Sequence, residues 1–412
     1  MILDIINKKR LGEELSYQEL EYFFNHYLEG DIADYQMSSL LMAICINGMS
    51  EEETFALTKI FIDSGDVLDF SKIPGVKLDK HSTGGIGDKT TLVIAPIIAS
   101  FGIPMIKMSG RGLGYTGGTI DKLESIPGFR VDLSDREIIK QVKDINLVVT
   151  GQTADLVPMD KVIYALRDVT STVSSIPLIA SSIMSKKIAG GADKILIDIK
   201  VGNGALLANQ KEAKELSDLM IKIGKVYQKE VKCIISDMNT PLGLAVGNSL
   251  EVLEAIRVLQ GKEEENNFTK LCEELSAEML CMAMDISKKE AHDQVKESIQ
   301  SGRAYQKFLE MVEYQKGDLS KIKVSQQKKP LIAYQSGVIT EINALALGKL
   351  SLSLGAGKVS KKDKIDYSVG IQLKKQLGDS VKKGDILAEM YVNKKVPEVN
   401  IHDIFVISKK NV

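Results

Sequence analysis

Apolar residues recur at helical spacing through most of the first 65 residues of this chain. Two Ser-x-x-Glu runs, residues 16–19 and 50–53, stand directly before such apolar residues, and each has the form of a capping box that starts a helix. Gly65 follows the second periodic stretch and is placed to end its helix. We therefore predict that a group of helices precedes the first strand.

The pattern changes near Val76, where short apolar runs begin to alternate with glycine turns and amphipathic stretches. Residues 103–106, 195–199 and 232–236 have the short apolar runs of buried strands, and residues 211–227 have helical periodicity. An alternation of strands and helices is typical of a largely parallel sheet with crossover helices. We predict such a sheet for the middle of the chain.

Two helical stretches, residues 160–173 and 178–189, interrupt that alternation. Pro177 opens the second stretch at its first turn, and Gly190 with Gly191 closes it. We expect both stretches to pack back on the N-terminal helices. One helical domain would then be built from two separate parts of the chain.

The end of the chain has a third character. Residues 316–330 are rich in lysine and lack periodicity, which indicates a linker, and strand-like runs around the turn at 377–387 follow it. The predicted fold class is α/β: a small all-helical domain, a large mixed α/β domain with a mostly parallel sheet, and a C-terminal β-rich α+β subdomain. The predicted domains are residues 1–66 with 160–190, residues 72–159 with 191–330, and residues 331–412.

Length and charge set limits on function. With 412 residues the chain has material for two or three domains, and its 53 lysines and arginines nearly balance its 55 aspartates and glutamates. The balanced charge and the lack of a long apolar run give no indication of a nucleic-acid or membrane partner. The N-terminus has its basic cluster after a short apolar run, the reverse of a secretory signal, so we expect a cytoplasmic protein.

The cysteines lack the paired spacing of a metal site. They are scattered along the chain as Cys45, Cys233, Cys272 and Cys281. We interpret them as small buried hydrophobic residues in a reducing compartment. The composition therefore gives no support for a transition metal or a catalytic thiol.

Two glycine-rich loops carry the strongest chemical signal. Residues 80–91 and 107–119 both mix glycine with lysine and hydroxyl side chains. Glycine lets backbone N–H groups approach a ligand, hydroxyls add donors, and lysine supplies positive charge, so this composition suits an oxyanion. The spacing matches neither a Walker A loop nor the dinucleotide fingerprint. We predict that the loops bind one phosphate group, with Arg111, Asp121 and Glu124 bracing the second loop.

A second candidate site lies on the two helices in the middle of the chain. Ile179, Ser182 and Lys186 share one helix face, and Tyr164 and Arg167 are neighbours on the helix before it. Together they offer an apolar wall, an aromatic ring, a hydroxyl and two cations. A planar heterocycle with carbonyl oxygens suits that face.

The sequence around both candidate sites closely resembles that of the thymidine and pyrimidine-nucleoside phosphorylases. The resemblance lies in residues 80–91, in residues 109–124, which resemble that family's signature, and in residues 164–170 and 181–187. It extends over essentially the whole chain, including the C-terminal segment at 336–348. It implies reversible phosphorolysis of uridine, thymidine or deoxyuridine to the free base and a pentose 1-phosphate, by a homodimer formed through the helical domain.

By that resemblance, three groups of residues have implied roles. Phosphate would be surrounded by Lys80, His81, Ser82, Thr91, Lys107, Met108, Ser109 and Thr119. The base and sugar would be lined by His81, Leu113, Tyr164, Arg167, Ile179, Ser182 and Lys186. One potassium ion per subunit would be held by backbone oxygens of Gly87, Lys89, Leu242 and Ala245 and by the Glu254 carboxylate. An all-oxygen site fits such a hard cation, and no organic cofactor is expected.

The implied chemistry is an attack of phosphate on the anomeric carbon while the N-glycosidic bond breaks and negative charge moves onto the base. Preorganised donors that meet this charge lower the barrier, and Arg167 and Lys186 suit that role. His81 is a further catalytic candidate, as a donor to the base.

Two positions depart from the family's pattern. Tyr115 stands where the signature more often has histidine, and residues 201–207 differ from the usual glycine-alanine-phenylalanine run although they stay rich in glycine. A protonation role at Tyr115 is therefore in doubt, whereas residues 201–207 can still turn.

Three other functions stay open. The chain is compatible with a strict thymidine phosphorylase, since no residue type fixes the preference for ribose or deoxyribose. An anthranilate-type phosphoribosyltransferase has a similar fold and phosphate loop. A non-catalytic binder or carrier is the third, because the turn near Gly378 faintly resembles biotinyl and lipoyl carrier domains, without their lysine-bearing acceptor motif.

Overall fold

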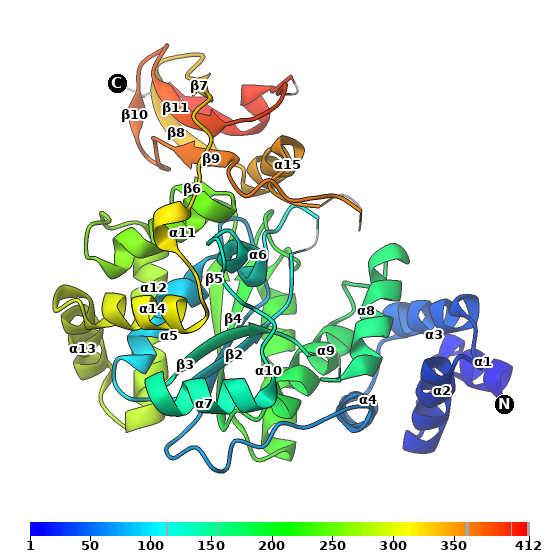
Figure 1. The fold of residues 1–412 in the computed structure, drawn as a ribbon. Coiled ribbons are helices and arrows are strands. Elements are labelled where there is room, and N and C mark those ends of the chain that lie inside the picture. Colours follow the sequence, from blue (N-terminus) through cyan, green and yellow to red (C-terminus); the bar gives the residue numbers. More distant parts are fainter. Residues whose placement is uncertain (113, 154, 359–361, 397, 410–412) are drawn as a thin grey trace. The chain divides into compact units, whose positions relative to one another are not determined.

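The computed structural model describes residues 1–112, 114–153, 155–358, 362–396 and 398–409. The chain forms two compact units and crosses between them five times, three of these within strands of the central sheet. Figure 1 shows the helices and strands, coloured along the sequence. The first unit comprises Met1–Asp79, Gln152–Ile195 and Asn209–Cys233, and the second comprises Lys80–Gly151, Leu196–Ala208 and Ile234–Val412. This division differs from the three predicted domains, because it joins the C-terminal segment to the sheet.

The first unit is helical. Its helices in the described residues are α1 (Ile2–Arg10), α2 (Tyr17–Glu29), α3 (Asp34–Asn47), α4 (Glu51–Asp63), α8 (Pro158–Val169), α9 (Ile176–Ala189) and α10 (Gln210–Val226). Helix α4 packs against α9, and α8 contacts α2, α3 and α4. The prediction that two helices from the middle of the chain pack on the N-terminal helices is therefore confirmed.

Local capping explains where the N-terminal helices begin. Ser16 and Ser50 both form complete capping boxes, with Glu19 and Glu53 as the third residues of α2 and α4. Helix α4 stops at Asp63 with Ser64 as its C-cap, so Gly65 directly follows the end of the helix, as predicted. Glycine is required at 65 for another reason: a Cβ there would lie 2.1 Å from the carbonyl oxygen of Asp155.

Helix α8 also differs from its prediction of residues 160–173. It begins at Pro158, whose fixed φ suits a first turn, and it ends at Val169. The carbonyls of Thr172 and Val173 leave the helical path and accept hydrogen bonds from the side chain of Arg167. Long-range side-chain bonding of this kind is invisible in the periodicity.

A five-stranded sheet in the order β3-β2-β1-β4-β5 forms the centre of the fold. Its strands are β1 (Leu78–Ser82), β2 (Met105–Ser109), β3 (Leu147–Gly151), β4 (Lys194–Val201) and β5 (Glu230–Asp237). Strands β2 and β3 pair in parallel. The predicted strands are confirmed, although β2 starts two residues later than predicted and includes Lys107.

The second unit also contains helices. They are α5 (Thr90–Ala99), α6 (Thr119–Glu124), α7 (Asp135–Ile145), α11 (Asn248–Leu259), α12 (Asn267–Met284), α13 (Lys288–Gln300) and α14 (Arg303–Tyr314). All ten residues of α5 are buried. Helix α5 packs against α11, α12 and α14, so it is the core helix of this unit.

The C-terminal segment is β-rich, as predicted. Two antiparallel sheets have the orders β6-β9-β11-β7 and β10-β8-β12. Their elements are β6 (Ala245–Val246), β7 (Lys328–Ile332), β8 (Gly337–Ile342), α15 (Ala344–Leu354), β9 (Gly370–Leu373), β10 (Ser380–Val381), β11 (Ile386–Tyr391) and β12 (Phe405–Ser408), with 3-10 turns at Leu319–Lys321 and Ile401–Asp403. Strand β7 begins inside the predicted linker. It was not predicted because it is an edge strand in which Leu331 alone is buried, so its sequence contains no apolar run.

The cysteines are not uniformly buried, which corrects their interpretation. Cys272 is buried, whereas Cys45, Cys233 and Cys281 are partly exposed. Burial raises the pKa of the Cys233 thiol to about 11 and raises the pKa of Cys45 and Cys272 as well. These three thiols are therefore protonated at neutral pH, which does not favour a nucleophilic role. Among the described helices, none is long and apolar enough to cross a membrane.

Candidate functional site

The first glycine loop connects the end of β1 to the beginning of the buried helix α5. Gly84 has a φ of +90°, and a Cβ on it would meet no atom within 4 Å, so its backbone borders open space. By contrast, a Cβ on Gly85 would collide with Met238. The loop is thus packed on one side and open on the other, at the N-terminus of a helix, where backbone N–H groups favour an anion.

The second glycine loop follows β2, the neighbour of β1 in the sheet. Lys107, Met108 and Ser109 are the last residues of β2, and Thr119 is the first residue of α6. The carboxyl ends of adjacent parallel strands meet at the same sheet edge, where α/β proteins bind ligands. The structure therefore places the predicted phosphate residues on two adjacent strand ends and on the helices that follow them.

Acidic residues brace the second loop, as predicted. Arg111 forms a two-pronged salt bridge with Glu124, whose Oε1 lies 2.7 Å from Nη2. Asp121 Oδ2 accepts the backbone N–H groups of Gly112 at 2.6 Å and Gly118 at 3.2 Å. These contacts close the loop on itself and hold its shape independently of a ligand.

Three residues near this loop need separate comment. Leu113, predicted to line the base, lies outside the described residues. Tyr115 is 39% exposed. Lys122, which the sequence pattern did not single out, is 1% exposed, and its Nζ donates to the Gly117 carbonyl at 2.6 Å. A lysine directly after an aspartate, in a short run that also contains Glu124, resembles a surface residue, so only the fold shows that it supports the loop.

A buried charge network lies behind the first loop. Lys80, Asp198 and Lys200 are fully buried. Lys80 Nζ donates to Thr90 Oγ1 at 2.6 Å and lies 3.7 Å from Asp198 Oδ2, while Lys200 Nζ lies 2.6 Å from the same carboxylate oxygen. Asp88 accepts hydrogen bonds from Ser82 at 2.5 Å and from the Thr90 hydroxyl at 2.6 Å. Two cations and two carboxylates therefore compensate one another.

This network shifts proton affinities. Burial by itself would raise the pKa of Asp88, but the ammonium groups of Lys80 and Lys200 and two hydroxyl donors lower it well below its usual value. Burial opposes the charge of Lys200, yet Asp198 and Asp88 raise its pKa. Asp198 and Lys200 were not predicted, although two charged residues within the apolar strand β4 are a usable signal.

The turn at residues 201–207, one of the two departures from the family's pattern, is present. Gly202 has a φ of +137°, and its N–H donates to the Leu207 carbonyl at 3.0 Å. The segment therefore turns without the usual aromatic residue.

The base-binding candidates lie in the first unit. Arg167 is 1% exposed, and its guanidinium donates to the carbonyls of Thr172 at 3.1 Å, Val173 at 2.8 Å and Leu178 at 3.1 Å. Burial lowers the pKa of Arg167, although Asp160 opposes this effect. Arg167 thus supports the connection between α8 and α9, and each terminal nitrogen keeps one further N–H.

Lys186 has different surroundings. Its side chain is 18% exposed, and its Nζ donates to Asp160 Oδ2 at 2.5 Å and to Ser182 Oγ at 2.9 Å. It also lies 5.8 Å from the centre of the Tyr164 ring. Asp160 was not predicted, and its other oxygen, Oδ1, is buried and has no hydrogen-bond partner among the described residues. The structure thus brings Tyr164, Ser182 and Lys186 together around one buried carboxylate.

Ile179, the remaining predicted base-lining residue, is 5% exposed on α9. His81 is partly exposed in β1, next to Lys80 and Ser82. It has an interaction of its own within the protein.

The residues predicted to bind potassium also lie together, in the second unit. Lys89 Nζ donates to the carbonyls of Leu242 at 2.6 Å and Ala245 at 2.9 Å, and lies 2.6 Å from Glu254 Oε2. A Cβ on Gly87 would lie 2.7 Å from the Leu242 oxygen. Three of the five oxygens expected around a metal ion, those of Leu242, Ala245 and Glu254, therefore contact the ammonium of Lys89, itself one of the predicted ligands.

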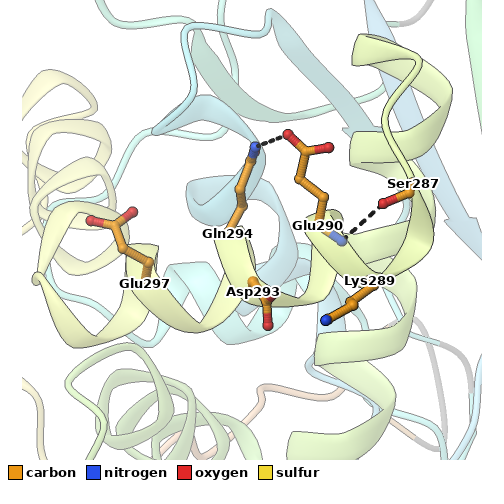
Figure 2. Close-up of a pocket in the computed structure, with 6 residues that line it drawn as sticks. All are labelled: Ser287, Lys289, Glu290, Asp293, Gln294 and Glu297. Carbon is orange, nitrogen blue, oxygen red and sulfur yellow. Dashed lines mark hydrogen bonds between the residues drawn. The ribbon is translucent and has the colours of Figure 1, made fainter.

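Figure 2 shows a pocket along α13 that contains none of the predicted residues. Its lining is Ser287, Lys289, Glu290, Asp293, Gln294 and Glu297. Three carboxylates against one ammonium repel a phosphate. This pocket is therefore not a candidate for the anion site.

Comparison with protein families gives three matches. A family described as "Glycosyl transferase family, a/b domain" matches residues 75–305, and its "helical bundle domain" matches residues 3–65. A "Pyrimidine nucleoside phosphorylase C-terminal domain" matches residues 338–404. The three matches follow the helical, α/β and β-rich parts of the chain.

Curated relatives are similar over nearly the full length. The pyrimidine-nucleoside phosphorylase of Staphylococcus haemolyticus is 49% identical over 411 residues, covering 98% of this chain and 94% of the relative. The proteins of that name from Geobacillus stearothermophilus and Bacillus subtilis are 48% and 47% identical, each covering 95% of this chain and 92% of the relative.

A solved structure shares the fold. Anthranilate phosphoribosyltransferase from Thermus thermophilus has a TM-score of 0.60 and 16% identity, covering 76% of this chain and 99% of that one. At this identity the likeness concerns the fold alone.

Proposed function

The chain belongs to the pyrimidine-nucleoside phosphorylase family, and on this premise we propose that it cleaves uridine, thymidine and deoxyuridine with inorganic phosphate. The products are the free pyrimidine and α-D-ribose or deoxyribose 1-phosphate, so the enzyme is a pentosyltransferase of pyrimidine salvage. One structural observation carries the proposal: two glycine loops with lysine and hydroxyl side chains follow adjacent strands of the sheet.

The phosphate is held by the second unit. Ser82, Thr91, Ser109 and Thr119 supply hydroxyl donors, and the open backbone at Gly84 allows N–H groups to approach. Lys80 adds charge, although Asp198 and Thr90 already fix its position. A rigid set of donors favours an anion because little reorganisation is needed on binding.

The base is held by the first unit. Lys186 uses two of its N–H groups on Asp160 and Ser182, and its third can donate to a pyrimidine carbonyl or ring nitrogen. The remaining N–H groups of Arg167 have the same chemistry. Tyr164 offers an aromatic face beside both cations.

In the reaction, a phosphate oxygen forms a bond to C1′ while the bond from C1′ to the base nitrogen breaks. The electron pair of that bond moves onto the base, and the Lys186 ammonium meets the developing negative charge. Asp160 is proposed as a positioning residue, because its carboxylate holds the Lys186 ammonium. His81 is proposed as an additional donor to the base.

The test is a direct comparison of two assays. Phosphate-dependent release of uracil from uridine and of thymine from thymidine is expected, with no consumption of phosphoribosyl pyrophosphate. The shared fold makes the phosphoribosyltransferase the specific alternative, and its activity in the second assay would replace the proposal. Release from thymidine without release from uridine or deoxyuridine would narrow the activity to a strict thymidine phosphorylase.

The proposal extends to a cytoplasmic homodimer formed through the helices of the first unit. Helices α1 and α3 pack together and carry several exposed large apolar residues, among them Leu3 at 66%, Tyr35 at 74% and Ile46 at 74% exposure. Such residues are typical of a surface that another chain covers. Light scattering should give twice the chain mass, and Ile46→Asp should shift the protein to monomer; a monomeric parent protein would contradict the assembly.

A further inference from the structure

The ammonium of Lys89 lies in a closed oxygen cage within the second unit. The Lys89 side chain has no exposed surface, and its Nζ is bonded to two backbone carbonyls and one carboxylate, at 2.6 to 2.9 Å. The three partners are Leu242, Ala245 and Glu254. Every N–H of the ammonium therefore has an acceptor. The Phe268 ring adds a cation–π contact, with its centre 4.8 Å from Nζ.

The oxygens of the cage, from the Glu254 carboxylate and two backbone carbonyls, carry negative charge. Glu254, on α11, also accepts the backbone N–H groups of Leu244 at 2.6 Å and Ala245 at 3.0 Å. Gly243 has a φ of +72°, and a Cβ on it would lie 2.6 Å from Glu254 Oε1. Glycine thus permits the segment to wrap tightly around the carboxylate. A buried carboxylate with two carbonyls beside it requires one positive charge.

A potassium ion does not fit this cage while Lys89 is present. Three of the five expected metal ligands, the oxygens of Leu242, Ala245 and Glu254, are atoms that the ammonium already contacts, and a second cation among them would be repelled by it. The Lys89 side chain also adds no oxygen of its own. The donor set in this chain therefore favours a different occupant from the predicted potassium ion.

We propose that Lys89 is a built-in cation, which supplies covalently the positive charge that a monovalent metal ion would otherwise bring to this cage. Lys89 caps α5 and directly precedes Thr90 and Thr91. Its bonds connect the end of the first glycine loop to β6 and α11. The shape of that loop is therefore independent of potassium in this protein, and this inference does not depend on the reaction.

Thermal unfolding of the full chain tests the inference without any assay of activity. The midpoint for the unaltered protein is measured while potassium chloride replaces tetramethylammonium chloride at constant ionic strength. The expected midpoint stays constant. A saturable rise with potassium, absent with tetramethylammonium, would overturn the proposal, because it would show a bound ion.

Two variants sharpen the test. Lys89→Ser removes the charge and leaves room and a hydroxyl oxygen, so its midpoint should fall by about 3 to 6 °C in tetramethylammonium and recover saturably with potassium. Lys89→Met keeps the bulk without charge or ligand, so it should fall and not recover. The exposed Lys214→Ser is the matched control and should behave as the parent in both salts.

Each outcome decides the question. A Lys89→Ser variant that is destabilised and ignores potassium would reject the exchange of lysine for a metal ion. If this variant does not fold in either salt, the titration of the parent protein decides alone. A potassium-independent protein that fails to release uracil would contradict the proposed function and leave this inference intact.

Discussion

The cations of the two units have opposite surroundings. In the second unit, Lys80 is fully buried and belongs to a network in which Asp88 and Asp198 balance Lys80 and Lys200. In the first unit, Lys186 is partly exposed and is bonded to Asp160 and Ser182. The buried network of the second unit holds the first glycine loop in one shape. The partly exposed Lys186 of the first unit keeps a positive charge that a ligand can reach. We infer that the phosphate side works by preorganisation and the base side by a reachable charge.

The largest effect is expected from removing the partly exposed ammonium of Lys186. Lys186→Ala should lower turnover by roughly 100- to 1000-fold, because the departing base loses its counter-charge in the transition state. Steady-state kinetics on a variant shown to be folded by circular dichroism is the measurement. Lys161→Ala, an exposed lysine of α8, is the control and should keep normal turnover. Normal turnover in folded Lys186→Ala would remove Lys186 from catalysis.

A variant of Arg167 tests whether this cation supports the structure, in contrast to the catalytic role proposed for Lys186. Arg167→Met should lower the free energy of unfolding by about 3 kcal/mol, because three backbone carbonyls lose their donor in a buried place. Chemical denaturation measures this loss, and turnover should fall as well. Lys161→Ala, the exposed control, should leave stability nearly unchanged by comparison. Unaltered stability of Arg167→Met would mean that the carbonyl contacts are unimportant.

The buried network makes a prediction about pH. The folded pKa of Asp88 is well below the unfolded value of about 4, so its ionised form contributes stability that is fully present above pH ~4 and lost as the pH falls through the folded pKa. Asp88→Asn should cost about 2 kcal/mol at neutral pH, and the difference should shrink in acid. Denaturation at a series of pH values measures it, and a difference that is constant with pH would exclude the charge as its cause.

The smallest effect concerns the positioning of Lys186. Asp160→Asn keeps the size of the side chain and removes its charge, so turnover should fall about tenfold, or about 1.4 kcal/mol in the barrier. The KM for phosphate should not change, because the phosphate residues belong to the other unit. A rise in that KM without a fall in turnover would contradict the assignment.

The local features of this protein were predictable from its sequence. Capping boxes, strand-forming runs and glycine loops depend on neighbours within a few positions, so Ser16, Ser50 and the two loops were recognised correctly. Where a long-range contact overrides the local pattern, the prediction was wrong. Helix α8 ends early beside the carbonyls that Arg167 holds, and β7 is an edge strand without an apolar run.

Only the tertiary structure shows which lysine ammonium groups are paired with oxygen atoms of the protein. Lys89 contacts carbonyls 153 and 156 positions away in the chain, and this separation makes its partners invisible to any periodicity. The same holds for Lys80 with Asp198 and for the buried Lys122. Residue types determined that phosphate and a heterocycle were the ligands to expect. Burial and pairing distinguish the buried lysines that hold the framework from the partly exposed Lys186, because an ammonium without water takes the nearest available oxygen.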